Sequence, residues 1–418
     1  MLERLHLTNV GPASELQVHW APRLNLIAGD NGLGKSFLLE VAWWALTRTW
    51  TGPAAQPHGG GPATIEYVLK GKSGKAALVK SSYRREDGTW SFPQSRPTMP
   101  GIVVYIRIDG GFSVWDPARN YWRTDPQRPA AYHFGSHEVW EGLDVNGRRV
   151  CEGLERDWVN WQEGQKEQFK VLKDVLQVLS PTGEPIEAGP PRRIFVGEGR
   201  DRPTLRIGNQ SVPVILASAG VRRVLALTYF LVWAWHEHRV AAGLLEKQPE
   251  NRFVILFDEP ETHLHPRWQR TLLPSLFTAI NGLPGVNAAA PQVLVATHSP
   301  LVAASVEPIF DADQDDLIHL QVAESGVSLV QGQWAVQGDA SNWLVSETFG
   351  LEQARSIEAE KAIEAAEAFM RGEQHLPVGL DNRDTIHAAL QRLLPAHDKF
   401  WPRWLVKSGH LPMPAEKA

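Results

Sequence analysis

The sequence of 418 residues contains a single cysteine, Cys151, and no long hydrophobic run. One cysteine cannot form a disulfide within the chain, so we expect the protein in a reducing compartment, the cytoplasm. The first residues lack the charged and then apolar pattern of a signal peptide. The longest apolar run, residues 224–235, is too short to cross a bilayer and is typical of a buried helix. The sequence therefore predicts no contact with a membrane.

An excess of positive charge is also absent. The formal net charge of −5 at pH 7 excludes a uniformly basic coat for nucleic acid but leaves room for a local basic face. Three extended runs between residues 64 and 92 predict an antiparallel meander with basic side chains, which could contact a phosphate backbone. A solvated sheet face is the more frequent alternative. The basic residues are Lys70, Lys72, Lys75, Lys80, Arg84 and Arg85.

Heptad repeats are too short for a long coiled-coil arm, and internal repeats are missing. What remains is ordinary soluble composition, with 43% hydrophobic and 21% charged residues. A chain of this length can bury one large core or two moderate ones. The sequence therefore predicts a globular protein whose function is carried by local motifs.

The most informative segment, residues 29–36, matches the phosphate-binding pattern G-x-x-x-x-G-K-S at every position. A buried strand is predicted before it and a helix after it. The glycines let the backbone wrap a triphosphate, and the helix adds the positive end of its dipole. Lys35 is expected to reach the β- and γ-phosphates, and Ser36 to offer its hydroxyl to Mg²⁺. The residues assigned to the nucleotide are Gly29, Asp30, Asn31, Gly32, Leu33, Gly34, Lys35, Ser36 and Phe37.

Two further buried strands are predicted to end in polar residues. The apolar run 253–257 is typical of a central parallel strand and leads to Asp258 and Glu259. In a P-loop protein Asp258 would hold a water on Mg²⁺, and Glu259 could accept a proton from the water that attacks the γ-phosphate. Residues 292–296 repeat the design and lead to His298, which could sense the γ-phosphate. The alternatives are an ordinary acidic turn and a packed loop histidine.

Residues 218–220, Ser-Ala-Gly, begin a helix that is apolar nearly all round, as expected of a buried helix. Ser218 is a natural N-cap, and the free N–H groups there form a second potential anion site. Before this helix, residues 100–191 contain a strand, aromatic-rich irregular sequence and a helical stretch between Trp158 and Leu179. We interpret that region as an inserted lid or arm.

The set and order of these motifs resemble an ABC-type ATPase head. The chain is most similar to the soluble branch that contains SMC, RecF and OLD proteins, and especially to the AAA-family ATPases of prokaryotic defence systems such as Septu and Gabija. The segments DEPETHLHP at 258–266 and THSP at 297–300 carry this closer match. The resemblance covers residues 1–50 and about 205–310.

The resemblance implies an α/β fold of the P-loop NTPase type. It implies a head of residues 1–310, with an N-terminal antiparallel β-subdomain and an inserted helical and aromatic lid at about 100–200. Residues 311–418 would form a mainly helical C-terminal extension. ATP and Mg²⁺ are the implied cofactors. Lys35, Glu259 and His298 are the implied catalytic residues, with Ser36 and Asp258 as metal-binding residues.

Ser218 and Gly220 match the signature that caps the nucleotide of a partner subunit. The resemblance thus implies a homodimer, or a higher oligomer of dimers, assembled on ATP. The usual signature has Gly where this chain has Ala219, and Gln or Glu where it has Val221. A convincing Q-loop glutamine is missing, with Gln94, Gln162 and Gln165 as candidates.

The implied function is slow ATP hydrolysis that regulates a separate effector, a nuclease or toxin, in anti-phage defence. A RecF- or SMC-like DNA repair ATPase and a nucleotide-gated scaffold remain open alternatives. The long insert and the HLHP phrase argue against a subunit of a membrane transporter. OLD and Gabija ATPases carry a fused TOPRIM nuclease, whereas here only Asp311 and Asp313 follow the last motif closely. We therefore expect effector chemistry outside this chain.

Overall fold

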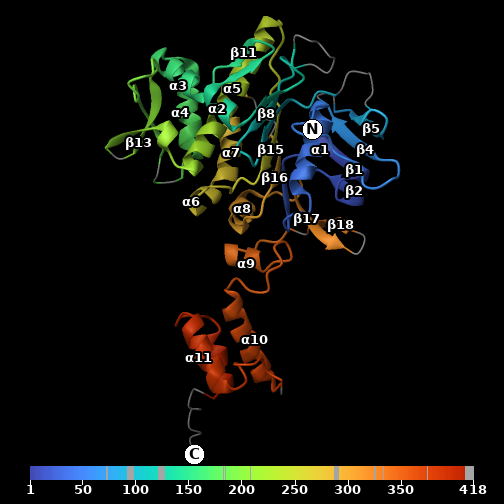
Figure 1. Cartoon of the computed structure of the whole chain (residues 1–418), viewed down its shortest axis with the longest axis vertical. Coiled ribbons are helices and arrows are strands. Elements are labelled where there is room, and N and C mark those ends of the chain that lie inside the picture. The colour runs from blue at the N-terminus through green and yellow to red at the C-terminus, as the bar shows by residue number, and fades with distance from the viewer. Residues whose placement is uncertain are drawn as a thin grey trace, which may run out of the picture. The chain divides into compact units, whose positions relative to one another are not determined.

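The computed structural model describes residues 1–71, 74–91, 98–120, 128–181, 183, 185–207, 209–286, 291–323, 326–332, 334–373 and 375–409. Lys72 and Gln94, singled out in the sequence, lie outside these residues. The chain divides into two compact units, Met1–Trp343 and Leu344–Ala418, and each is described by itself (Figure 1).

A sheet of 13 strands, as far as the described residues define it, is the framework of the first unit. Its middle is parallel, and the strands there are buried along most of their length, as strands covered on both faces must be. The carboxyl ends of parallel strands meet at one edge, where the loops that follow can form a site. In spatial order these strands are β17 (Asp315–Ala323), β3 (Leu24–Gly29), β16 (Gln292–Ala296), β15 (Phe253–Asp258) and β7 (Ile102–Ile106).

Antiparallel strands extend the sheet on both sides, so the predicted N-terminal antiparallel β-subdomain is present. Beyond β17 the order is β18 (Gly326–Gly332), β2 (Ala13–His19), β1 (Leu2–Val10), β4 (Thr64–Lys70), β5 (Ala76–Arg84) and β6 (Thr89–Trp90). Beyond β7 the order is β8 (Phe112–Trp115) and β9 (Tyr132–Phe134).

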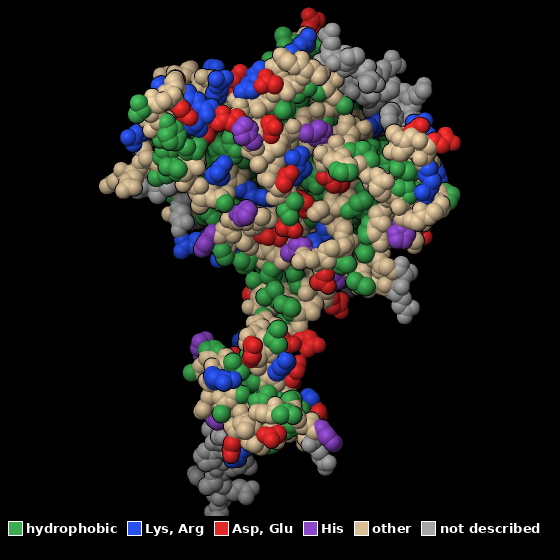
Figure 2. Space-filling view, in the orientation of Figure 1, with side chains coloured by type: hydrophobic (Ala, Val, Ile, Leu, Met, Phe, Trp, Pro, Cys, Tyr) green, Lys and Arg blue, Asp and Glu red, His purple; other side chains and the backbone are tan. Residues whose placement is uncertain are grey.

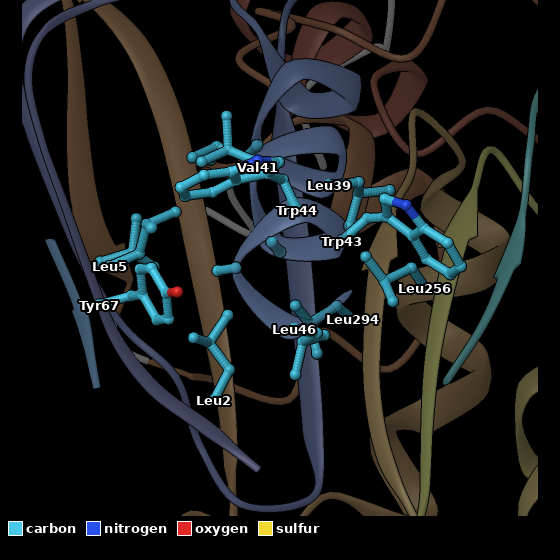
Figure 3. Packing of buried hydrophobic residues seen from close by; sticks show 14 of the residues in the cluster. Leu2, Leu5, Leu39, Val41, Trp43, Trp44, Leu46, Tyr67, Leu256 and Leu294 are labelled. Atoms are coloured by element: carbon cyan, nitrogen blue, oxygen red, sulfur yellow. The ribbon is translucent and has the colours of Figure 1, made fainter. Parts of the chain in front are cut away.

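Helix α1 (Lys35–Thr47) packs between two groups of strands of this sheet and is buried nearly all round (Figure 3). Figure 3 shows it between two groups of strands: Leu5 and Tyr67 lie on one side, and Leu256 and Leu294 on the other. Trp43 is fully buried in the same cluster. Because both faces of α1 contact apolar strands, its sequence lacks a polar stripe. The P-loop that precedes it is therefore joined to the best-packed part of the molecule.

The predicted insertion is present, but its helical stretch is two helices. Helix α3 (Leu154–Glu163) ends before Gln165, whose φ of 50° breaks the helix, and α4 (Glu167–Leu179) follows. The insertion also contains a small antiparallel sheet that the sequence did not reveal. Its other elements are α2 (Ser136–Glu141), β10 (Leu143–Val145), β11 (Arg148–Cys151), β12 (Glu187–Arg192), β13 (Arg202–Ile207) and β14 (Gln210–Pro213).

Helix α5 (Ala219–Leu244) is the long buried helix expected after Ser218, and it packs against α4. None of the helices in the described part of the chain is long and apolar enough to span a bilayer. The remaining elements of the first unit are η1 (Val214–Leu216), α6 (Pro266–Gln269), α7 (Leu272–Asn281), α8 (Pro300–Val306), η2 (Glu307–Ile309) and α9 (Ala340–Leu344), the last of which ends at the unit boundary.

The predicted boundary between the head and the C-terminal extension lies at residue 310, whereas the first compact unit of the structure ends at Trp343. Strands β17 and β18 follow that residue and belong to the central sheet, with β17 directly beside the P-loop strand β3. The first compact unit accordingly continues to Trp343. The alternating pattern of β17 has its pairing partner near the N-terminus, and nothing in the local sequence reveals this partner.

The second unit is helical, as expected. It contains α10 (Ile357–Arg371), α11 (Arg383–Leu393) and α12 (Trp401–Lys407). Alanines on one face of α10 let the helices approach closely, and the fully buried Trp404 fills the space between them.

Candidate functional site

The P-loop leaves β3 and turns directly into α1. Gly34 has φ 96°, a left-handed conformation that favours glycine. It is the N-cap residue of α1, and among the described residues no side chain caps this helix. Gly29 is required by close packing, because a Cβ there would lie 2.3 Å from the carbonyl oxygen of Leu320 in β17. Asn31 and Gly32 are exposed, whereas Leu33 is buried and anchors the loop. The N–H groups of the first turn of α1 therefore face an open loop.

Lys35 lies across this loop. Its Nζ donates hydrogen bonds to the carbonyl oxygens of Gly29 at 2.7 Å and Asp30 at 2.8 Å. Burial lowers the pKa of its ammonium, since the charge has lost part of its water. Both partners are neutral, so the positive charge is still available to an anion. Phe37 follows and packs against the core of the first unit.

Ser36 and Asp258 come from different elements and meet. The Ser36 hydroxyl donates to Asp258 Oδ1 at 3.0 Å. Asp258 is 2% exposed, and its burial raises the pKa of its carboxyl to about 6, although the hydrogen bond from Ser36 opposes this. Within the described residues no Lys or Arg forms an ion pair with Asp258. A buried carboxylate beside a hydroxyl, without a cation of its own, fits a Mg²⁺ site.

Glu259 and His298 form the next part of the site. Glu259 has φ 45°, a strained conformation for a residue other than glycine, and its N–H donates to the Ala296 carbonyl at 2.9 Å. His298 Nε2 lies 3.6 Å from Glu259 Oε1. Burial, and then the charge of Lys35, lowers the pKa of His298, so its imidazole is neutral at pH 7. Both side chains keep part of their surface open to solvent.

Two residues of this site escaped the sequence analysis, Arg223 and Glu261. Arg223 Nη2 donates to the carbonyl oxygens of Asp258 and Glu259, each at 3.0 Å. Glu261 accepts hydrogen bonds from the segment that carries His298. A sequence signal existed for both: Arg223 is an arginine at the start of an otherwise apolar helix, and Glu261 belongs to the DEPE phrase.

Ser218 and Gly220 lie beside the turn that follows β15. A Cβ at Gly220 would lie 2.6 Å from the His263 carbonyl oxygen, so glycine permits this close approach. Ser218 is exposed and caps α5 by accepting the Val221 N–H at 3.4 Å. The guanidinium of Arg222 lies over the Trp140 ring, 4.5 Å from its centroid. A cleft of about 180 Å³ opens here, lined among others by Asp109, Trp140, Ala219, Arg222, Arg223 and His263.

Of the glutamines considered for the Q-loop, Gln162 and Gln165 lie in the described part of the chain. Gln162 accepts from Trp158 Nε1 at 3.0 Å and donates to the Gly189 carbonyl at 3.0 Å, so it holds the insertion together. Gln165 lies in the turn between α3 and α4. Strand β7, which pairs with β15 on the side away from β16, leads to Arg107 and not to a glutamine.

The basic side chains of the N-terminal meander are mostly paired. Lys80 contacts Glu66 at 2.6 Å, Lys70 contacts Glu3 at 3.3 Å, and Arg84 contacts Asp87 at 3.5 Å. Arg85 donates to the Gly59 carbonyl at 2.7 Å, and Lys75 is exposed. On the face seen in Figure 2, blue and red side chains are interspersed over the first unit. This pattern favours a solvated surface over a nucleic-acid interface.

Two protein families match parts of this chain. Residues 4–129 match a family described as "AAA domain", and residues 208–304 match one described as "AAA domain, putative AbiEii toxin, Type IV TA system". The first match contains the P-loop, and the second contains Ser218, Asp258, Glu259 and His298. These matches support an AAA-type ATPase domain.

Several solved structures are similar in fold at low sequence identity. The SMC head domain from Thermotoga maritima is 14% identical, with 80% of this chain and 99% of that chain covered and a TM-score of 0.40. An SMC head bound to the C-terminal winged-helix domain of ScpA is 11% identical, with 79% and 97% covered and a TM-score of 0.43. A similar head with an extended coiled coil, bound to the C-terminal domain of ScpA derived from Pyrococcus furiosus, is 11% identical, with 79% and 96% covered and a TM-score of 0.39.

Proposed function

We propose that this protein binds ATP with Mg²⁺ and hydrolyses it slowly. The observation that carries the proposal is the meeting of two pairs of side chains at the carboxyl ends of neighbouring parallel strands. Ser36 Oγ lies 3.0 Å from Asp258 Oδ1, and His298 Nε2 lies 3.6 Å from Glu259 Oε1. These contacts support phosphate-binding, metal-binding and general-base roles within one site, to which Lys35 contributes a buried ammonium.

Each residue has a role that its position supports. Lys35 exchanges its two carbonyl partners for β- and γ-phosphate oxygens, while Ser36 and Asp258 hold the metal and its water. Mg²⁺, when bound, neutralises negative charge on the transferred phosphoryl group. Glu259 accepts the proton of the attacking water. His298, being neutral, donates an N–H toward a γ-phosphate oxygen. A carboxylate at this position would instead repel the nucleotide.

ATP turnover and binding in three proteins test this proposal. The wild type hydrolyses ATP slowly and only with Mg²⁺. Lys35→Ala abolishes binding, because the phosphates lose their buried cation. Glu259→Gln binds ATP but stops before hydrolysis, since an amide cannot accept the proton. Turnover unchanged in Glu259→Gln would remove this residue from its role, and a wild type that neither binds nor hydrolyses ATP would overturn the proposal.

We also propose that two copies associate on ATP, as a homodimer or a higher oligomer of dimers. Ser218 is exposed at the start of the long helix α5. Its hydroxyl and the free N–H groups of the first helical turn can therefore contact the γ-phosphate held by another copy. Hydrolysis in a single copy would be slow for the same reason, because the phosphate contacts of Ser218 come from the partner copy. Ala219 stands where the usual signature has glycine, and it adds only one methyl group to this helix start.

For the biological role, we propose regulation of a separately encoded nuclease or toxin in anti-phage defence. The matched family described as a putative AbiEii toxin of a type IV toxin–antitoxin system supports this direction. A RecF- or SMC-like repair ATPase and a nucleotide-gated scaffold are the alternatives. Neighbouring genes discriminate: a nuclease or reverse transcriptase favours defence, and recombination genes favour repair. DNA contact, where it occurs, would weaken steeply with added salt.

Effector chemistry within this chain is not part of the proposal. Asp315 pairs with Arg23, and Asp311 accepts the Asp313 N–H at 3.0 Å in a turn before β17, so these carboxylates have structural partners. Three glutamates in the second unit have carboxylate oxygens within 4.8 Å of one another, and this is the one group of that kind in the described residues. They are largely exposed, as acidic side chains without a metal usually are, and consist of Glu352, Glu360 and Glu364.

A further inference from the structure

Glu261 is a partly buried carboxylate without a role in the proposed mechanism, although it lies two residues after Glu259. Both of its oxygens accept hydrogen bonds from the segment that follows β16. Oε2 accepts the Thr297 hydroxyl at 2.8 Å, and Oε1 accepts the His298 backbone N–H at 2.5 Å. Glu261 therefore joins the turn after β15 to the segment after β16.

These hydrogen bonds fix the main chain that carries the His298 imidazole. Thr297 is fully buried and donates its N–H to the Ile27 carbonyl at 3.0 Å, which ties it to the P-loop strand. Its hydroxyl oxygen also accepts the Ser299 N–H at 3.0 Å. The His298 backbone is thus held on one side by Thr297 and at its own N–H by Glu261. From that position Nε2 lies 3.6 Å from Glu259 Oε1.

Withdrawing the Glu261 carboxylate from water costs free energy. No Lys or Arg forms an ion pair with Glu261 in the described ranges, and burial raises the pKa of its carboxyl. Well-packed apolar residues usually match or exceed the stability of a buried charge. A partly buried carboxylate that accepts two hydrogen bonds is therefore better explained by its placement of the neighbouring segment than by stability.

We propose that Glu261 is a positioning residue for ATP hydrolysis, which acts by holding His298 at its distance from Glu259. This inference rests on the proposed ATPase function and deepens it. Glu261 itself touches neither the phosphates nor the attacking water. In this proposal the hydrogen bonds of Glu261 set the position of His298, and hence its distance from the proton acceptor Glu259.

Turnover and binding of ATP in two substitutions test the role. Glu261→Ala lowers kcat by about 10-fold, the size expected for losing hydrogen bonds to a charged group. Its affinity for ATP stays within about 3-fold, because the P-loop is untouched. Glu261→Gln retains at least roughly a third of kcat, since its amide oxygen can accept the His298 N–H and its NH₂ can meet the Thr297 hydroxyl. Glu66→Ala, which removes a surface glutamate paired with Lys80, is the matched control and leaves kcat unchanged.

A double-mutant cycle separates positioning from a general structural role. When His298→Ala is already present, adding Glu261→Ala lowers kcat by less than about 2-fold further, because the group it positions is gone. Fully multiplicative effects would overturn the proposal. Thr297→Val, nearly equal in shape, removes one of the two donors and lowers kcat by about 3-fold. It replaces Glu261→Ala should that variant fail to fold, and an unchanged kcat would contradict the proposal.

Amide hydrogen exchange without nucleotide tests the contact independently of turnover. Glu261→Ala speeds exchange in a peptide covering residues 292–303, whereas Glu66→Ala does not. Unchanged exchange in Glu261→Ala would overturn the inference even when the wild type is an active ATPase. An inactive wild type with faster exchange in Glu261→Ala would instead overturn the proposed function and leave the contact established.

Discussion

The guanidinium of Arg223 donates a hydrogen bond to the main-chain carbonyl oxygen of Glu259 at 3.0 Å. Glu259 has a left-handed φ of 45°, and such strain costs about 1–3 kcal/mol in a residue other than glycine. Arg223 is therefore one of the contacts that hold the proposed base in place. Ser218 caps the helix that contains Arg223. We therefore predict that Arg223 couples the start of α5 to the position of Glu259.

Replacing Arg223 should accordingly impair hydrolysis more than binding. We expect Arg223→Ala to lower kcat by about 10-fold, corresponding to roughly 1.4 kcal/mol, with ATP affinity nearly unchanged. Arg223→Lys should fall between, since an ammonium can reach one carbonyl but lacks the planar fork. Arg239→Ala, on the same helix in a surface pair with Glu167, is the control. Equal turnover in Arg223→Ala and Arg239→Ala would count against the coupling.

Asp258 makes the nucleotide-free protein less stable at neutral pH. Burial raises the pKa of its carboxyl to about 6 in the folded protein, from the ordinary value of 3.8, so the folded state binds more protons between these pH values. Stability therefore falls as the pH rises through this window. Asp258→Asn keeps an acceptor for Ser36 and should raise the free energy of unfolding at pH 7 by about 1–3 kcal/mol.

This gain should shrink as the pH falls toward 4, where Asp258 is already protonated in the folded state. Denaturant unfolding at several pH values, without nucleotide and Mg²⁺, measures it. Asp87→Asn, an exposed aspartate next to Arg84, should show no such pH dependence. A loss of stability in Asp258→Asn at pH 7 would contradict the cost assigned to the buried charge.

Association on ATP should depend on Ser218. In the Glu259→Gln background with ATP and Mg²⁺, a mass measurement should show a dimer. Ser218→Arg should remain a monomer that still binds ATP. Position 218 is exposed, so an arginine fits there in a single copy, but it would clash in the interface between two copies. Ser82→Arg, at an exposed position on β5, should still form dimers. A strict monomer in the Glu259→Gln background would sink the dimer proposal.

The purified protein alone should not cut DNA. Lys35, Asp258, Glu259 and His298 are all assigned to ATP, so no metal-dependent nuclease centre is left among them. Incubation with plasmid, Mg²⁺ or Mn²⁺, and ATP is the measurement, with ATP turnover as the check that the protein is folded. Cleavage that is lost on substitution of Asp311 and Asp313 would prove this expectation wrong.

The sequence predicted those parts of the protein that depend on local patterns. The P-loop, the strand before Asp258 and the buried helix after Ser218 were found because spacing and hydropathy alone define them. Strand β17 was missed because its neighbour β3 is almost three hundred residues away, and its short alternation is ordinary at any position. The length of the head therefore had to come from the structure.

The same division applies to the site. Lys35 and Ser36 are recognisable from their neighbours in the chain, whereas Arg223 and Glu261 acquire their roles only from atoms of other segments. Nearly every residue has a backbone carbonyl and a backbone N–H. The patterns that contain Arg223 and Glu261 therefore do not show that the Glu259 carbonyl and the His298 N–H are their partners. Gln162 shows the converse: a residue type that fits a motif is occupied by packing within the insertion.

Strand β3 has consequences for the synthesis of this protein. Its neighbours β16 and β17 are both far downstream, and the Leu24 N–H is bonded to the Asp315 carboxylate, 291 residues later. A chain emerging from the ribosome therefore holds a complete phosphate-binding sequence on an unpaired apolar strand for most of its translation. Long-range parallel pairing of this kind folds slowly and exposes strand edges to aggregation. Truncated translation products should be insoluble or chaperone-bound, and no nucleotide-binding fragment should accumulate before the last strands of the sheet are made.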